Sequence, residues 1–148
     1  MSRMPRLLVA GVVLALAGVP LAGCKEVETE TATGYEPAKL EEVKGNDDVK
    51  RVIFTAEGAE RIGLRTARVR RNGRHEVVPH KSLIYDAEGK TYVYTSPKPL
   101  TYLRVPVQVD RVDGARVVLN KGPAPRTAVV TVGAAEVYGT ELEIAGSH

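Results

Sequence analysis

Residues 66–79 read TARVRRNGRHEVVP, and this stretch decides the fold. Two segments with strand-like composition, 66–71 and 74–78, flank Asn72-Gly73. Asn-Gly is the strongest short signal for a two-residue hairpin turn, because both central residues of such a turn take positive φ. The sequence therefore predicts two adjacent antiparallel strands joined at Asn72-Gly73.

Short strand patterns recur around this hairpin at intervals of roughly ten residues. The clearest of these strands is Thr101–Asp110, in which apolar residues on one face alternate with Tyr102 and Arg104 on the other. Pro106 lacks an N–H, so this strand lies at an edge or leaves that position unpaired. Further strands are expected at 51–55, 83–85, 91–95, 115–120 and 127–132, with turns at 86–90, 96–99 and 113–114. The pattern predicts a mainly β fold, a small antiparallel barrel or sandwich.

One short helix interrupts the strands. Residues 56–62 (AEGAERI) follow Thr55, a favourable N-cap, and precede Gly63, a favourable helix stop. We therefore expect one or two helical turns here.

Composition limits the classes of protein to consider. The chain has 148 residues, 21 Lys+Arg and 18 Asp+Glu, for a formal charge of +3. This length suits one domain, and the mild charge argues against a nucleic-acid partner. The single cysteine excludes an intramolecular disulfide and a multi-cysteine metal site.

The first 24 residues have the pattern of a lipoprotein leader. Arg3 and Arg6 precede an apolar run of 13 residues, 7–19, which is signal-peptide length. Residues 21–24 (LAGC) resemble the bacterial lipobox, whose cysteine accepts a diacylglyceryl group. The alternatives are a transmembrane helix over 7–24 and an ordinary secretory signal. We expect residues 1–23 to be a signal peptide and Cys24 to carry acyl chains such as palmitate. The protein would then be anchored at the extracytoplasmic face of the cell membrane, in the periplasm of a two-membrane organism.

Residues 25–50 are acidic and residues 51–148 are basic. The first segment holds four Lys and eight Asp or Glu (4 − 8 = −4), and the second holds 15 Lys+Arg and 10 Asp+Glu (15 − 10 = +5). The acidic segment has little apolar surface to offset the entropy of ordering, so we expect a disordered tether over 24–50 and a folded domain over 51–148. A short helix over 37–44 is an alternative within the tether.

Five segments of the domain share a pattern with one known family. They are 53–66 (IFTAEGAERIGLRT), 78–85 (VPHKSLIY), 89–94 (GKTYVY), 103–107 (LRVPV) and 127–136 (TAVVTVGAAE). In this order they resemble the periplasmic adaptor proteins, or membrane fusion proteins, of tripartite efflux pumps. Full-length adaptors carry a lipoyl-like domain, a long α-hairpin and a β-barrel where this chain has only Asn72-Gly73. The resemblance is therefore to the membrane-proximal domain alone.

This resemblance implies a non-catalytic accessory protein, anchored by lipid, that docks on a transporter permease or on another copy of itself. A small-molecule-binding or metal-binding envelope lipoprotein is the alternative. We expect no enzyme, because no nucleophile elbow and no phosphate-binding loop is present in the sequence. We also expect no cofactor and no metal, because His75 and His80 are five apart and would face opposite ways on a strand.

Two groups of residues are candidates for docking. The first is an arginine cluster, which can contact anionic lipid headgroups or an acidic protein surface; its members are Arg65, Arg68, Arg70, Arg71 and Arg74, with Arg61 beside them. The second is Tyr92 and Tyr94, which share a strand face. The competing interpretations are a solvated basic face and cross-strand packing of the tyrosines.

Overall fold

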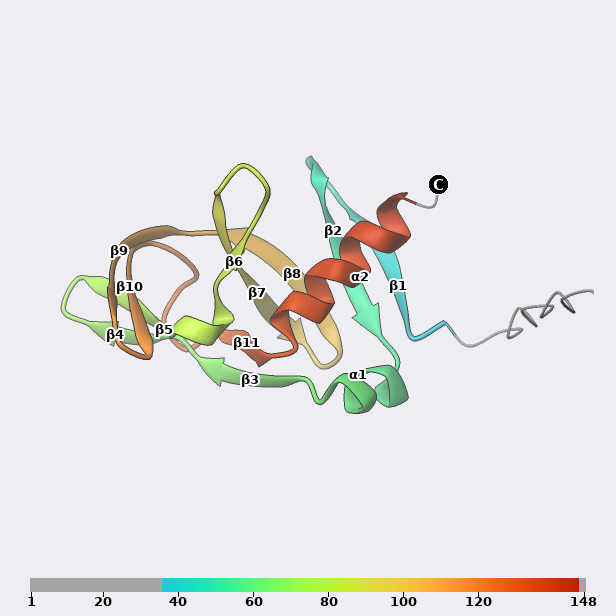
Figure 1. Cartoon of the computed structure of the whole chain (residues 1–148), viewed down its shortest axis with the longest axis horizontal. Coiled ribbons are helices and arrows are strands. Elements are labelled where there is room, and N and C mark those ends of the chain that lie inside the picture. Colours follow the sequence, from blue (N-terminus) through green and yellow to red (C-terminus); the bar gives the residue numbers. More distant parts are fainter. Residues whose placement is uncertain (1–35, 147–148) are drawn as a thin grey trace, which may run out of the picture. The chain divides into compact units, whose positions relative to one another are not determined.

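The computed structural model describes residues 36–146, which lie in one compact unit (Figure 1). Cys24, the signal peptide and the first part of the expected tether lie outside the described residues. The strands are β1 Ala38–Val43, β2 Asn46–Phe54, β3 Arg65–Arg68, β4 Arg70–Asn72, β5 His75–Pro79, β6 Ile84–Tyr85, β7 Thr91–Lys98, β8 Thr101–Pro106, β9 Gln108–Asp113, β10 Arg116–Lys121 and β11 Ala128–Val132. The helices are α1 Ala56–Ile62, the 3₁₀ turn η1 His80–Ser82, and α2 Ala134–Gly146. Within this range, neither α-helix combines the length and the hydropathy needed to cross a membrane.

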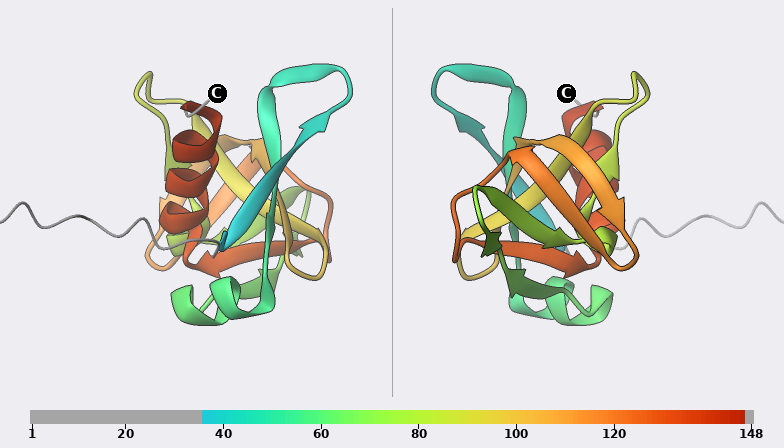
Figure 2. Two further views of the ribbon diagram at one scale, coloured as in Figure 1. Left: turned by 90° about the vertical axis from the view of Figure 1, so that its right-hand side faces the viewer. Right: turned by 90° about the vertical axis from the view of Figure 1, so that its left-hand side faces the viewer.

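The strands form two antiparallel sheets, so the expected fold class is confirmed. The larger sheet has the order β1-β2-β8-β7-β11-β3, with β6 paired to β7, and the smaller has the order β4-β5-β10-β9. One core lies between the sheets and contains Val93, Val129, Val78 and Val117. A second core lies on the other face of the larger sheet, beneath α1 and α2 (Figure 2).

The central strands of the larger sheet are buried on both faces. Val93 and Val129 face the smaller sheet, whereas their neighbours Tyr94 and Val130 face the helical side. Side chains alternate between the faces of a strand, so β7 and β11 belong to both cores at once.

The predicted short helix is confirmed at its expected ends. Thr55 Oγ1 accepts a hydrogen bond from the Gly58 N–H at 3.0 Å, which caps the N-terminus of α1. Gly63 ends the helix with φ of 73°, the left-handed conformation that glycine adopts most easily.

The predicted hairpin also forms, but its turn lies one residue further on. Asn72 pairs with His75, so the two central turn residues are Gly73 and Arg74. Gly73 has φ of 61° and Arg74 does not have a positive φ. A positive φ at the first central position alone fits a type II′ turn, which favours Gly there, rather than the type I′ turn of Asn-Gly.

The prediction of a disordered tether over 24–50 was wrong for its second half. Residues 38–50 belong to the β1–β2 hairpin, not to a coil or to a helix over 37–44. Its charges neutralise one another across the strands, because Lys50 contacts Glu42 at 2.6 Å and Arg51 contacts Glu41 at 3.4 Å. Ala38 and Val49 are buried on the hairpin. The average composition of residues 25–50 does not reveal these cross-strand ion pairs and buried positions.

Three further elements differ from the sequence-based expectation. Helix α2 was not predicted, because its buried residues are only Ala134, Val137 and Glu141. The turn expected at 96–99 lies at Pro99-Leu100, since β7 continues to Lys98. The strand expected over 101–110 is divided at Val107 into β8 and β9, which belong to different sheets.

We predict that Gly73→Val lowers the free energy of unfolding by about 1–3 kcal/mol, because a β-branched residue is strained at positive φ. Urea denaturation measures the change. Gly139→Ala is the control: Gly139 lies in α2 with open space around its missing Cβ, so alanine should stabilise by about 0.5–1 kcal/mol. An unchanged unfolding midpoint for Gly73→Val would contradict the turn geometry.

Candidate docking face and its groove

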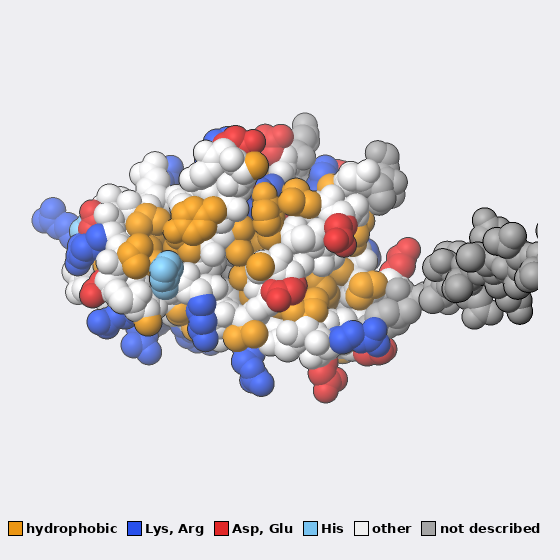
Figure 3. Space-filling model, in the orientation of Figure 1, with side chains coloured by type: hydrophobic (Ala, Val, Ile, Leu, Met, Phe, Trp, Pro, Cys, Tyr) orange, Lys and Arg blue, Asp and Glu red, His pale blue; other side chains and the backbone are white. Residues whose placement is uncertain are grey.

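The candidate arginines extend from a rigid β-scaffold. Arg65 and Arg68 lie on β3, Arg70 and Arg71 on β4, and Arg74 in the hairpin turn, and all five are exposed. In Figure 3, basic side chains project around the end of the domain that contains β4, β5, β9 and β10 and along the lower edge, where Figure 1 places β3. We call the five residues the arginine face.

None of the five arginines of this face forms an ion pair in the part of the chain that the structure describes. Arg68 instead donates a hydrogen bond to the carbonyl oxygen of Arg126 at 3.0 Å. Arg61 is different, since it lies on α1 and pairs with Glu57 at 2.7 Å.

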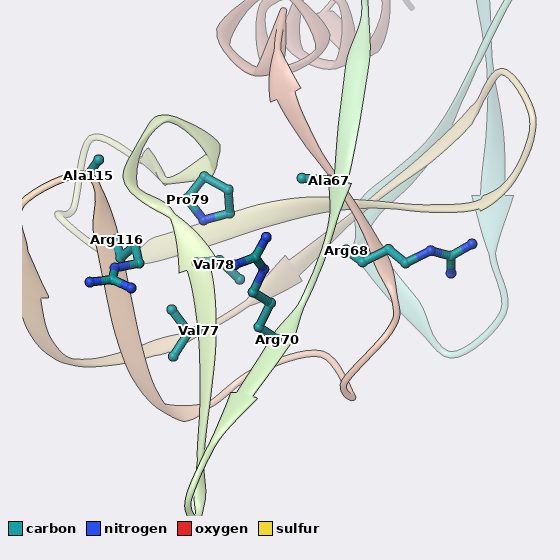
Figure 4. Close-up of a pocket in the computed structure, with 8 residues that line it drawn as sticks. All are labelled: Ala67, Arg68, Arg70, Val77, Val78, Pro79, Ala115 and Arg116. Carbon is teal, nitrogen blue, oxygen red and sulfur yellow. The ribbon is translucent and has the colours of Figure 1, made fainter.

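A groove opens within the arginine face, between β3 and β5. It has a volume of about 320 Å³ and is lined by Ala67, Arg68, Arg70, Val77, Val78, Pro79, Ala115 and Arg116 (Figure 4). Its floor is apolar, since Val78 is fully buried and Pro79 and Ala67 lie beside it. The side chain of Arg70 reaches toward Val78 and Pro79, whereas Arg68 extends away. The groove thus places one unpaired guanidinium beside an apolar surface.

The candidate tyrosines are not an exposed patch. Tyr94 is fully buried and its hydroxyl donates to the Glu141 carboxylate, so its assignment to a docking surface was wrong. Burial, reinforced by Glu141, raises the pKa of Tyr94. Tyr92 is half-buried, with the Arg104 guanidinium 4.9 Å from its ring centroid. Burial and a hydrogen bond to Asp86 raise the pKa of Tyr92.

Sequence reasoning missed a buried polar cluster that fixes α2 to the larger sheet. Glu141 Oε1 accepts from Arg104 Nη2 at 3.2 Å and from the Lys50 backbone N–H at 3.1 Å. Arg104 Nη2 also donates to the Asp48 carbonyl oxygen at 2.8 Å. The Arg104 guanidinium also lies over the ring of Tyr138 on α2, 5.5 Å from its centroid. We call Arg104, Glu141 and Tyr94 the polar latch.

The latch could not be read from the sequence. Its only signal was the alternation that placed Arg104 on the same strand face as Tyr102, which is buried. Glu141 belongs to the helix that was not predicted. The cluster is structural, because its carboxylate is almost wholly enclosed by protein groups.

The structure brings no metal-binding set together in the part of the chain that it describes. Within residues 36–146, no group of three or more His, Cys, Asp or Glu side chains is arranged to hold a metal ion. His75 Nδ1 lies 3.3 Å from the Leu119 carbonyl oxygen, and His80 is exposed.

Comparison with protein-family models, with curated proteins and with solved structures finds no match for this chain.

We predict that Glu141→Gln destabilises the fold by about 3–5 kcal/mol, because it leaves the Arg104 charge buried without a counter-charge. The measurement is the urea-unfolding free energy. Glu143→Gln is the matched control on the exposed side of α2 and should change stability by less than about 0.5 kcal/mol. Equal effects of the two substitutions would show that the latch is unimportant.

Proposed function

We propose that the protein is a lipid-anchored accessory protein of the cell envelope that docks on the extracytoplasmic face of a membrane transporter. This proposal combines the resemblance of residues 21–24 to a lipobox with the ordered resemblance of residues 51–140 to the membrane-proximal domain of efflux adaptors. The chain has a two-residue turn where adaptors carry their remaining domains. Its role would therefore be confined to the surface of the transporter.

The observation that carries the proposal is the unpaired charge of the arginine face. Arg65–Arg74 contains the five arginines of this face within ten residues, and like charges so close together repel one another. Exposed charges contribute little to stability. The arginine face thus contributes little to the stability of the fold, but its positive electrostatic potential would attract an acidic partner.

A protein partner suits this face for a second reason. Arg68, Arg70 and Arg71 project from strands rather than from loops, so the backbone that carries them is in place before binding. Preorganised groups lose less entropy on association. Guanidinium groups also bind carboxylates in a bidentate manner, which fits an acidic protein surface.

We predict that replacing Arg68, Arg70 and Arg71 by Gln leaves the melting temperature nearly unchanged but weakens docking. A photo-crosslinking residue in place of Arg74, in host membranes, should link the wild-type chain to a permease. The triple substitution should reduce that product strongly, and added salt should reduce it for the wild type.

Lys39, Lys44 and Lys98 changed to Gln form the control, because they remove the same charge from exposed sites on other elements. If both triple variants crosslink equally, net charge rather than the arginine face guides the chain. If the crosslinked product contains no permease, the proposed function is wrong.

We further predict that Cys24→Ser releases the chain from the membrane fraction or leaves its leader uncleaved, because the thiol is the site of acylation. Fractionation and the mass of the mature chain measure this. A wild-type protein that keeps residues 1–23 would instead indicate a membrane-spanning leader.

A further inference from the structure

The groove exists because the β4–β5 ladder stops early. The ladder pairs Asn72 with His75 and Arg70 with Val77. Two residues further, the same register would place Arg68 opposite Pro79. Proline has no N–H to donate, and the Pro79 carbonyl oxygen already accepts the Ser82 hydroxyl at 2.6 Å. The β5 side therefore offers no hydrogen bond there, and the strands separate.

The β3 side of the groove keeps its backbone groups available. Val69 donates its N–H to Thr127 O and accepts from the Arg126 N–H, both at 2.8 Å, on the side away from β5. Backbone groups of successive strand residues point to opposite sides. The N–H and C=O of Arg68, and by the same alternation those of Thr66, consequently point toward the groove. In the described structure β3 is the last strand of the larger sheet, so no strand pairs with this side.

The side chains that line the groove favour particular residues in a strand bound at the free edge of β3. An extended segment beside β3 would place alternate side chains toward the groove floor of Val78, Pro79 and Ala67. The intervening side chains would lie near the arginines that flank the groove, including Arg70, which has no ion pair among the described residues. The groove thus matches a strand with alternating apolar and acidic residues.

We propose that the groove binds an extended segment of the docking partner, in which apolar and acidic residues alternate, as an additional strand on β3. This assignment rests on the proposed function in that the segment belongs to the docking partner. Strand addition takes its affinity from main-chain hydrogen bonds and its specificity from alternate side chains. The Arg68 and Thr66 backbone groups would form the main-chain hydrogen bonds. The apolar floor and Arg70 would select the side chains of the bound segment.

The observations favour this occupant over two others. A second copy pairing through β3 would bring Arg65 and Arg68 against the same residues of its partner, which is unfavourable. A lipid headgroup can contact the guanidinium groups, but it offers no repeating donors and acceptors for the free edge of β3.

The test uses the full chain in a non-ionic detergent and a fluorescent peptide of about six residues with alternating Glu and Val, enough to cover β3. Fluorescence anisotropy gives the dissociation constant. An analogue with Gln in place of Glu should bind about tenfold more weakly, because charge-assisted hydrogen bonds are lost. An analogue with N-methylated backbone amides should also lose at least about tenfold, since it cannot form the ladder. Bound peptide should slow amide hydrogen exchange at Arg68 and Thr66.

Two variants locate the site. Arg70→Gln should weaken the peptide about tenfold, whereas Arg111→Gln, on β9 at the opposite edge of the smaller sheet, should not. Pro79→Val restores an N–H opposite Arg68, so β5 should close against β3. In that variant the Arg68 amide should exchange slowly without peptide, and peptide binding should be lost.

Equal binding of the N-methylated peptide would overturn strand addition and leave only charge attraction. Binding of monomeric short-chain phosphatidylglycerol that depends on Arg70, without binding of the peptide, would make the groove a lipid site. Dimerisation of the wild type that Arg70→Gln abolishes would assign the groove to a second copy. If the peptide binds as expected but no permease is crosslinked, the groove is a strand-binding site and the proposed transporter role is wrong. If a permease is crosslinked but the peptide does not bind, the transporter role is supported and the proposal for the groove is wrong.

Discussion

The backbone of Val69 is the constraint on which the arrangement of both sheets depends. Its two hydrogen bonds, to Thr127 and from Arg126, draw the chain away from β5 and onto the larger sheet. Its side chain is buried in the core between the sheets. Residues 65–72 therefore run as one strand path that belongs to the larger sheet before Val69 and to the smaller sheet after it. The groove is the space left by this crossing.

The polar latch complements this crossing on the other face of the larger sheet. Helix α2 buries few apolar side chains, so hydrophobic contact alone would allow it several positions. Glu141 accepts hydrogen bonds from Arg104, Tyr94 and the Lys50 backbone, and all three form together in the observed placement of the helix. A buried carboxylate is costly when unpaired, so the latch selects that placement. It also fixes the β1–β2 hairpin, because Lys50 and Asp48 belong to β2.

Local signals were predictable from the sequence, whereas signals that depend on tertiary partners were not. Thr55 and Gly63 define α1 because capping acts within a few residues. Gly73 marks the hairpin, although Asn72 suggested a different turn, because the strand pairing and not the dipeptide sets the turn position. The β1–β2 hairpin looked disordered because its ion pairs join residues on different strands. Tyr94 looked like a surface residue because its partner, Glu141, lies 47 positions away.

The β1–β2 hairpin and the β3–β4 strand path treat charge in opposite ways, and this contrast links the fold to the proposed function. Across β1 and β2, Glu42 meets Lys50 and Glu41 meets Arg51, so each of these charges is neutralised by the neighbouring strand. On β3 and β4, Arg65 and Arg68 lie opposite Val132 and Ala128, and Arg70 lies opposite Val77, so these three have no carboxylate across the ladder. Arg71 lies opposite Glu76, yet the two form no ion pair in the described structure. The same chain thus neutralises the charges of the β1–β2 hairpin and leaves the β3–β4 path with like charges that repel. That repulsion can be relieved by an acidic partner, and the groove lies where such a partner would also meet an open strand edge.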